Sequence, residues 1–114
     1  MRGFALAVAL GLWSTVSDAA CRQALALGLD VSGSVDPGEY RVQMSGLAEA
    51  LRTDDVAEAV VGSQAALALV QWTGASRQRL TVPWTQIGNH KDLAAFADTV
   101  ETDPRIWRNF STAI

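Results

Sequence analysis

The fold of this 114-residue chain is decided by the stretch ALALGLDVSGS, which spans residues 24–34. Its first six residues are apolar or glycine, and such a run is typical of a parallel strand that is covered on both faces. We therefore predict a buried strand from Ala24 to Val31 at the centre of a sheet. Oxygen-bearing side chains follow at alternate positions, and a tight loop, with Gly33 free to adopt a positive φ, can gather them around one point. They are Asp30, Ser32 and Ser34.

These three side chains indicate a divalent-cation site. Mg²⁺, Mn²⁺ and Ca²⁺ prefer oxygen ligands, and Mg²⁺ usually keeps several waters, so one carboxylate and two hydroxyls form a reasonable ligand set. We predict Mg²⁺ as the ion, with Mn²⁺ and Ca²⁺ as alternatives, and a vacant coordination position that accepts an acidic group of a partner. The competing interpretation is a polar turn, because Asp and Ser are common after strands, where they hydrogen-bond locally.

A helix is predicted directly after this loop. Asp36 can accept hydrogen bonds from the free amides of the first turn, and Pro37 suits the first helical position. Glu39 follows Asp36 by three residues, which completes a capping-box pattern. From Pro37 to Arg52 the apolar residues recur at spacings of three and four, as on the buried face of an amphipathic helix. They are Tyr40, Met44, Leu47, Ala48 and Leu51.

The middle of the chain predicts a hairpin. Residues 65–73 are rich in Leu, Val and Trp and form a predicted strand, and residues 77–84 alternate apolar and polar side chains, as a half-exposed edge strand does. The link Gly74–Ser76 is too short for a parallel crossover, so the two strands should pair antiparallel. Val56–Val61 is compatible with either a short helix or a strand, and we expect Asp54 and Asp55 in an exposed turn before it.

A second helix is predicted from His90 to Glu101. Asn89 can cap its first turn, and its apolar residues fall on one face. That face consists of Leu93, Phe96, Ala97 and Val100. The residues after it, 102–109, form a loop that carries Trp107, a candidate aromatic for the rim of a partner-binding surface, although simple packing is the alternative.

On these residues the chain resembles the von Willebrand factor type A domain, whose metal-ion-dependent adhesion site begins with Asp-x-Ser-x-Ser at the end of the first strand. The match is Asp30, Ser32 and Ser34. The flanking residues 27–36, with Glu39 and Tyr40, resemble a secreted bacterial branch of that superfamily whose function is uncharacterised. The resemblance implies an α/β fold with a doubly wound, mostly parallel, Rossmann-like sheet, in which the first strand is central.

The same resemblance implies how the site is completed. The two serines bind the metal directly, the aspartate often acts through water, and a threonine from a second loop corresponds to Thr112. The aspartate of the family's third loop has no counterpart in this sequence. We therefore expect the chain to be the N-terminal part of such a domain, a C-terminally truncated fragment in which metal occupancy is reduced.

The first 20 residues have the pattern of a secretory signal, with a basic start, the apolar core Phe4–Trp13 and small residues leading to Ala19 and Ala20. We therefore assign residues 1–20 to a signal peptide and residues 21–114 to the domain. The expected location is periplasmic or extracellular, with no stable membrane span once the signal is removed. Cys21 is the single cysteine, and its partner is expected downstream or in another chain. The alternative is a lipoprotein acylated at Cys21.

Composition and motifs argue against several functions. The formal charge is −3 without a basic patch, which disfavours nucleic-acid binding. There is no Gly-x-Ser-x-Gly motif, Ser32 stands where a phosphotransferase would carry a second aspartate, and His90 is the only histidine. We therefore predict a binding module rather than an enzyme, with a protein partner that presents Asp or Glu. The alternatives are a structural periplasmic domain with a vestigial site or, less favoured, a hydrolase or phosphotransferase.

Overall fold

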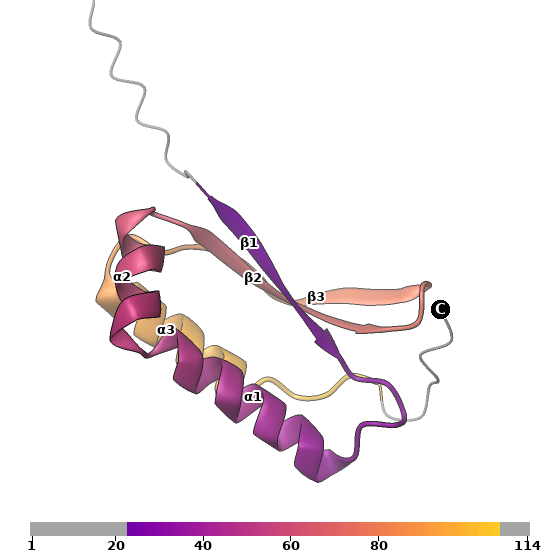
Figure 1. Ribbon diagram of the computed structural model, residues 1–114. Helices are drawn as coiled ribbons and strands as arrows, with labels where there is room; N and C mark the ends of the chain where they lie inside the picture. The colour runs from indigo at the N-terminus through magenta and orange to yellow at the C-terminus, as the bar shows by residue number, and fades with distance from the viewer. Residues whose placement is uncertain (1–22, 108–114) are drawn as a thin grey trace, which may run out of the picture.

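The computed structural model describes residues 23–107, which form a mixed α/β unit with one three-stranded sheet (Figure 1). The strand order is β1-β2-β3, with β2 parallel to β1 and β3 antiparallel to β2. Its elements, in chain order, are β1 (Ala24–Asp30), α1 (Pro37–Leu51), α2 (Asp54–Gly62), β2 (Ala66–Thr73), β3 (Arg77–Gln86) and α3 (His90–Glu101). This arrangement is a partial Rossmann-like α/β fold. The predicted signal peptide, Cys21 and Thr112 lie outside the described residues.

The two helices predicted with caps are both confirmed. Asp36 caps α1 in a reciprocal capping box: its Oδ1 accepts from the Glu39 amide at 2.8 Å, and Glu39 Oε2 accepts from the Asp36 amide at 3.2 Å. Asn89 caps α3 by accepting from the Asp92 amide at 2.8 Å. Such caps fix where a helix begins from a few neighbouring residues, which explains why the sequence located both N-termini correctly.

One hydrophobic core lies between the helices and one face of the sheet. All three helices lie on the same side of the sheet (Figure 1), and their apolar faces meet Leu67, Leu69 and Val82 of β2 and β3. The predicted buried face of α3 is confirmed, and Met44, Ala48 and Leu51 of α1 are buried with it. Burying apolar surface at about 25 cal/mol per Å² makes this layer the main source of stability in the described part of the chain.

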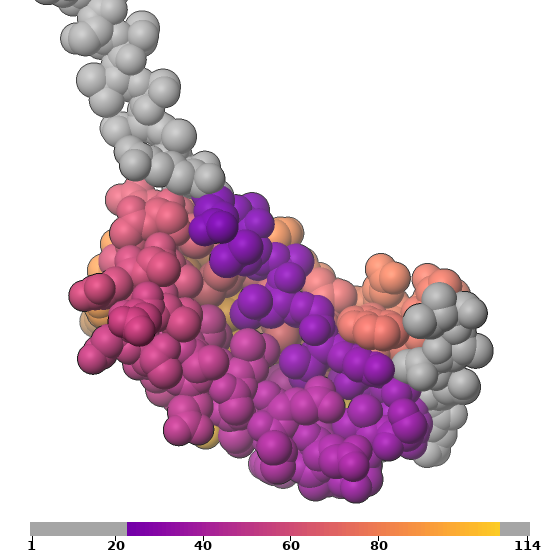
Figure 2. Space-filling model, viewed as in Figure 1, coloured from indigo at the N-terminus to yellow at the C-terminus, as the bar shows by residue number. Residues whose placement is uncertain are grey.

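The prediction for the first strand was wrong in two respects. Among residues 23–107, β1 is an edge strand, and β2 occupies the middle of the sheet. Nor is β1 buried on both faces: Leu25, Leu27 and Leu29 pack against the core, whereas Ala24, Ala26 and Gly28 are exposed. The continuous apolar run conceals an alternation of large and small residues. Successive strand side chains point to opposite faces, so this alternation places the bulk on the helix side. Figure 2 shows β1, in indigo, at the molecular surface.

The hairpin is confirmed as antiparallel with β3 at an edge, but the predicted apolar face of β3 is not continuous. Val82 pairs with Leu69 and is buried, while Leu80 pairs with Val70 on the other face. The pairing of β2 with β3 shifts its register between Leu69 and Val70. Such an irregularity turns the side chains that follow it to the opposite face of the sheet, so Leu80 and Val82 lie on different faces. Leu80 and Trp84 are consequently 43% and 50% exposed.

The ambiguous segment around Val56–Val61 is the helix α2, and the exposed turn predicted at Asp54 and Asp55 is its first turn. Two carboxylates there are favourable because the N-terminus of a helix carries partial positive charge. Thr53, at the N-cap, makes no side-chain capping bond, so the local signal for a helix start is weak. None of the helices among the described residues is long and apolar enough to cross a membrane.

Candidate metal site at the carboxyl end of β1

The loop of residues 31–36 brings the three predicted ligands together. The Ser32 amide donates to Asp30 Oδ1 at 2.8 Å, and the Ser32 and Ser34 hydroxyl oxygens lie 3.0 Å apart. The Val35 amide donates to the Ser32 carbonyl at 3.0 Å, which closes a tight turn. Gly33 does not use the positive φ that the sequence suggested, since the positive φ values among the described residues are at Gln64 and Gly74.

The burial of the loop is graded from the core to solvent. Val31 and Ser32 are fully buried, Asp30 is half-buried and Ser34 is exposed. A buried serine whose hydroxyl points toward an exposed one forms a pair of oxygens that runs from the interior to the surface. Ser34 therefore carries the solvent-facing hydroxyl of the pair, and Ser32 the buried one.

The ligand set contains hydroxyls rather than a cluster of acids. No group of three or more His, Cys, Asp or Glu side chains suited to a metal occurs within residues 23–107. One carboxylate and two hydroxyls are hard oxygen donors, which suit Mg²⁺, Mn²⁺ or Ca²⁺ and are unsuited to ions that prefer sulfur or imidazole. The side chains that converge after β1 therefore fit a hard cation chemically.

A single arginine holds the backbone of this loop. The guanidinium of Arg105 donates to the carbonyl oxygens of Val31 at 2.9 Å, Ser32 at 2.5 Å and Val35 at 2.7 Å. Its Nε donates to the Trp107 carbonyl at 2.8 Å. The segment after α3 is thereby attached to the loop after β1, although about 70 positions separate them in the sequence.

A buried polar network continues from Arg105 into the sheet. Gln71 of β2 is fully buried, and its Nε2 lies within hydrogen-bond distance of the Tyr40 hydroxyl (3.3 Å), Asp103 Oδ2 (2.8 Å) and the Pro104 carbonyl (2.9 Å). Its Oε1 accepts from the Ile106 amide at 3.0 Å. Tyr40 donates to the Asp103 carbonyl at 2.6 Å, and the Arg105 guanidinium lies 5.9 Å from the centre of its ring. We refer to Gln71, Tyr40, Asp103 and Arg105 as the site-end network.

The environment of this network raises the pKa of Tyr40 to about 12, chiefly because burial penalises the phenolate and secondarily because Asp103 is negatively charged. Arg105, Gln71 and Arg41 oppose the increase to a smaller extent. Tyr40 therefore remains a neutral hydrogen-bond donor at physiological pH, as its bond to the Asp103 carbonyl requires.

A cleft of about 650 Å³ lies beside the loop, between the first turns of α1 and the segment after α3. Gly33 and Val35 of the loop form one wall, and Tyr40, Arg41 and Met44 of α1 contribute to another. The cleft is thus both apolar and charged, and it adjoins the residues predicted to bind a metal.

The remaining predicted site residues are only partly described. Thr112 lies outside the described residues, so its place relative to Ser32 and Ser34 stays a prediction. Trp107 is half-buried, and the hydrogen bond from Arg105 to its carbonyl places it near the loop. His90 is the first residue of α3, whose 12 residues span about 18 Å. The last residues of α3, not His90, point toward the end of the sheet that carries the loop after β1 (Figure 1). His90 is therefore remote from Asp30 and Ser32.

The sequence reasoning missed Gln71 and Arg105. Gln71 did carry a signal, since it is the only amide or charged residue in the apolar run of β2, and a buried polar side chain needs partners. Arg105 carried none, because its partners are backbone carbonyls distant in sequence.

The model of the family described as "Protein of unknown function (DUF1194)" matches residues 20–114, and the chain belongs to this family. No curated protein matches the chain.

Proposed function

We propose that this member of the DUF1194 family is an exported binding module that uses a divalent cation, Mg²⁺ in the first place, to coordinate an acidic group of a protein partner. Asp30, Ser32 and Ser34 would hold the ion, with Thr112 as a further ligand, as the resemblance to the von Willebrand factor type A domain implies. The bound ion would supply a positive charge with a vacant coordination position. Trp107 would lie at the rim of the partner-binding surface.

The observation that carries this proposal is the pair of hydroxyl oxygens 3.0 Å apart on Ser32 and Ser34. Adjacent ligands of an octahedral Mg²⁺ at its usual bond lengths are about 2.9 Å apart, whereas the longer bonds of Ca²⁺ separate them further. The distance between the two hydroxyl oxygens therefore matches that of neighbouring Mg²⁺ ligands. Because Asp30 is already hydrogen-bonded to the Ser32 amide, its carboxylate is held beside the pair.

The cleft next to the loop supports a macromolecular partner rather than a free ion alone. Its volume of about 650 Å³ is sufficient for several side chains, and Val35 and Pro37 give it accessible apolar surface. A partner could place a carboxylate on the ion and adjoining residues in the cleft. Such an interaction requires no bond to be broken and no catalytic base.

The direct test is Mn²⁺ binding, measured by the loss of the free-ion electron paramagnetic resonance signal when the full chain is added. We expect one Mn²⁺ per chain, displaced by excess Mg²⁺. Ser32→Ala and Ser34→Ala each remove one ligand oxygen and should weaken binding at least about tenfold, an effect at least as large as that of disturbing a residue behind a ligand. No Mn²⁺ uptake by the unmodified chain, or serine variants that bind Mn²⁺ as tightly as the unmodified chain, would refute the cation site.

Ser63→Ala is the matched control, because Ser63 ends α2 at the other end of the sheet and donates to the Val60 carbonyl. Its Mn²⁺ affinity should equal that of the unmodified chain. The partner chemistry is tested with beads that carry a glutamate-containing peptide or its glutamine counterpart. We expect the chain to be retained on the glutamate beads alone, and only when Mg²⁺ is present. Retention that persists when EDTA is added would contradict coordination through the ion.

A further inference from the structure

We infer that Arg105 is a positioning residue for the cation site, a role that rests on the proposed function. It binds no ion or partner itself. It holds the loop after β1 in the shape in which the Asp30 carboxylate accepts from the Ser32 amide and the Ser32 hydroxyl meets that of Ser34.

The donors of Arg105 are almost fully committed to this loop and to its own segment. A guanidinium has five N–H donors in a planar fork, and four hydrogen bonds link that of Arg105 to the carbonyls of Val31, Ser32, Val35 and Trp107. No described carboxylate forms an ion pair with it, in contrast to Arg52. Arginine thus acts here as a backbone brace, a use for which a planar fork is suited and a single ammonium is not.

The brace acts on Asp30 through one peptide plane. In a trans peptide the C=O and the following N–H point in opposite directions, and the described residues contain no cis peptide. Because the Val31 carbonyl is directed at Arg105, the Ser32 N–H must point away from it. That N–H donates to Asp30 Oδ1 at 2.8 Å. Arg105 therefore fixes the direction of the donor that orients the carboxylate.

The brace also fixes Ser32 from its other side. The Ser32 carbonyl accepts from Arg105 and from the Val35 amide, so both backbone polar groups of Ser32 are held. With its backbone fixed and its side chain buried, the Ser32 hydroxyl has little freedom besides its contact with Ser34. A metal ligand held in this way loses little entropy when an ion binds.

The positive charge of Arg105 makes the direction of the change in metal affinity informative. A guanidinium close to a cation site repels the cation, so a purely electrostatic view predicts tighter metal binding when the charge is removed. The positioning role predicts the opposite, weaker binding, because the loop relaxes. The two effects cannot be confused in a binding measurement.

The experiment uses the full chain and Mn²⁺, at a temperature at which circular dichroism shows each variant folded. Arg105→Gln should weaken Mn²⁺ binding about tenfold or more, the range typical of residues that orient metal ligands. Arg105→Lys keeps the charge but cannot reach all four carbonyls, and it should also weaken binding. Arg79→Gln is the charge control, because Arg79 is an exposed arginine of β3 that pairs with Gln71 in the sheet and does not line the cleft. It should bind Mn²⁺ as tightly as the unmodified chain, or slightly more tightly.

A second readout needs no metal. Amide hydrogen exchange at Ser32, followed by NMR, should accelerate about tenfold or more in Arg105→Gln, because the N–H loses its fixed direction toward Asp30. Arg52→Gln should leave it unchanged. Unchanged or tighter Mn²⁺ binding by folded Arg105→Gln would overturn the inference. If the unmodified chain takes up no Mn²⁺, the proposed function fails, and Ser32 exchange then decides alone whether Arg105 holds the loop.

Discussion

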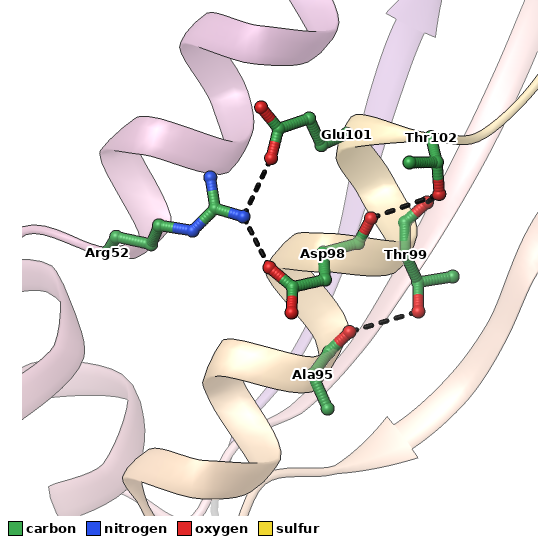
Figure 3. A network of polar contacts seen from close by, with 6 residues as sticks. All are labelled: Arg52, Ala95, Asp98, Thr99, Glu101 and Thr102. Atoms are coloured by element: carbon green, nitrogen blue, oxygen red, sulfur yellow. Dashed lines mark hydrogen bonds and ion pairs between the residues drawn. The ribbon is translucent and has the colours of Figure 1, made fainter.

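Arg52 and Arg105 both connect the first half of the chain to the second, and they do so through different kinds of partner. Arg52 follows α1 and donates from Nη2 to Asp98 at 2.5 Å and Glu101 at 2.8 Å on α3 (Figure 3). All three side chains are more than a third exposed. Arg105 instead donates to main-chain carbonyls and belongs to the site-end network, whose central residue, Gln71, is fully buried.

The difference shows what each connection can control. An exposed ion pair joins two flexible side chains and is screened by water and salt, so it hardly restrains the backbone. Hydrogen bonds from a buried or half-buried side chain to carbonyls fix the direction of peptide planes. Figure 3 shows that the hydrogen bonds near Arg52 are local: Thr99 donates to the Ala95 carbonyl, and Thr102, the residue after α3, donates to the Asp98 carbonyl. We therefore expect the site-end network to shape the candidate site and the Arg52 network to leave it unaffected.

The largest effect in this comparison is predicted for Gln71→Ala. The substitution removes the partner of the Ile106 amide and of the acceptors on Asp103 and Pro104, which lie in a partly buried region, and each group that stays shielded from water without a partner costs about 1–3 kcal/mol. We expect a loss of about 3 kcal/mol in the free energy of unfolding, measured by urea denaturation. The Ser32 amide should also exchange faster, because the segment that carries Arg105 is no longer fixed.

The matched control is Gln78→Ala, at an exposed position of β3. It should change the free energy of unfolding by less than about 0.5 kcal/mol, as surface substitutions usually do. Should Gln71→Ala prove equally mild, the site-end network would be no stronger than a surface contact, and the contrast with Arg52 would disappear.

The pH dependence of Tyr40 tests the same network by another property. Tyr40 is the only tyrosine, so phenolate absorbance near 295 nm reports it alone. Its pKa should be about 12 in the folded chain, against 10.0 for an unperturbed phenol. Because the folded state raises this pKa, the associated stability is complete below about pH 10 and is lost as the pH rises through 12. A midpoint near 10 while circular dichroism still shows a folded chain would contradict burial of the hydroxyl.

Tyr40→Phe provides the control for that titration. It removes the phenol, so the absorbance change should vanish, and so should the part of the alkaline stability loss that belongs to Tyr40. The remaining loss then measures the other groups that titrate at high pH.

Much of the fold was predictable from the sequence because its signals are local. The capping residues Asp36 and Asn89, the spacing of apolar residues on α1 and α3, and the short link Gly74–Ser76 each depend on neighbours in sequence. The predictions failed where the signal lay in side-chain size or in pairing irregularities. In β1, Ala and Leu are both apolar, so hydrophobicity alone did not predict which of them face the core. No local sequence pattern predicted the register shifts between β2 and β3.

The convergence of the three candidate ligands was predictable from the sequence, and the contacts that support them were not. Asp30, Ser32 and Ser34 follow one another in the chain, so their convergence needed only a tight loop, which the structure provides. Their support comes from Arg105 and Gln71, whose partners, apart from the Trp107 carbonyl, are more than 30 positions away. Contacts of that kind arise from the topology, because the crossover from β1 to β2 and the return along α3 bring both loops to one end of the sheet.

The smallest effect is predicted for Arg52→Gln. The substitution removes both ion pairs but keeps a polar side chain of similar length, and the groups it leaves behind remain hydrated. The urea midpoint should shift less than for Gln71→Ala, and the shift should vanish in about 1 M NaCl, where charges are screened within about 3 Å. Mn²⁺ affinity and Ser32 exchange should match those of the unmodified chain. A change in either would show that the position of α3 controls the loop after β1, and the two arginines would then belong to one coupled system.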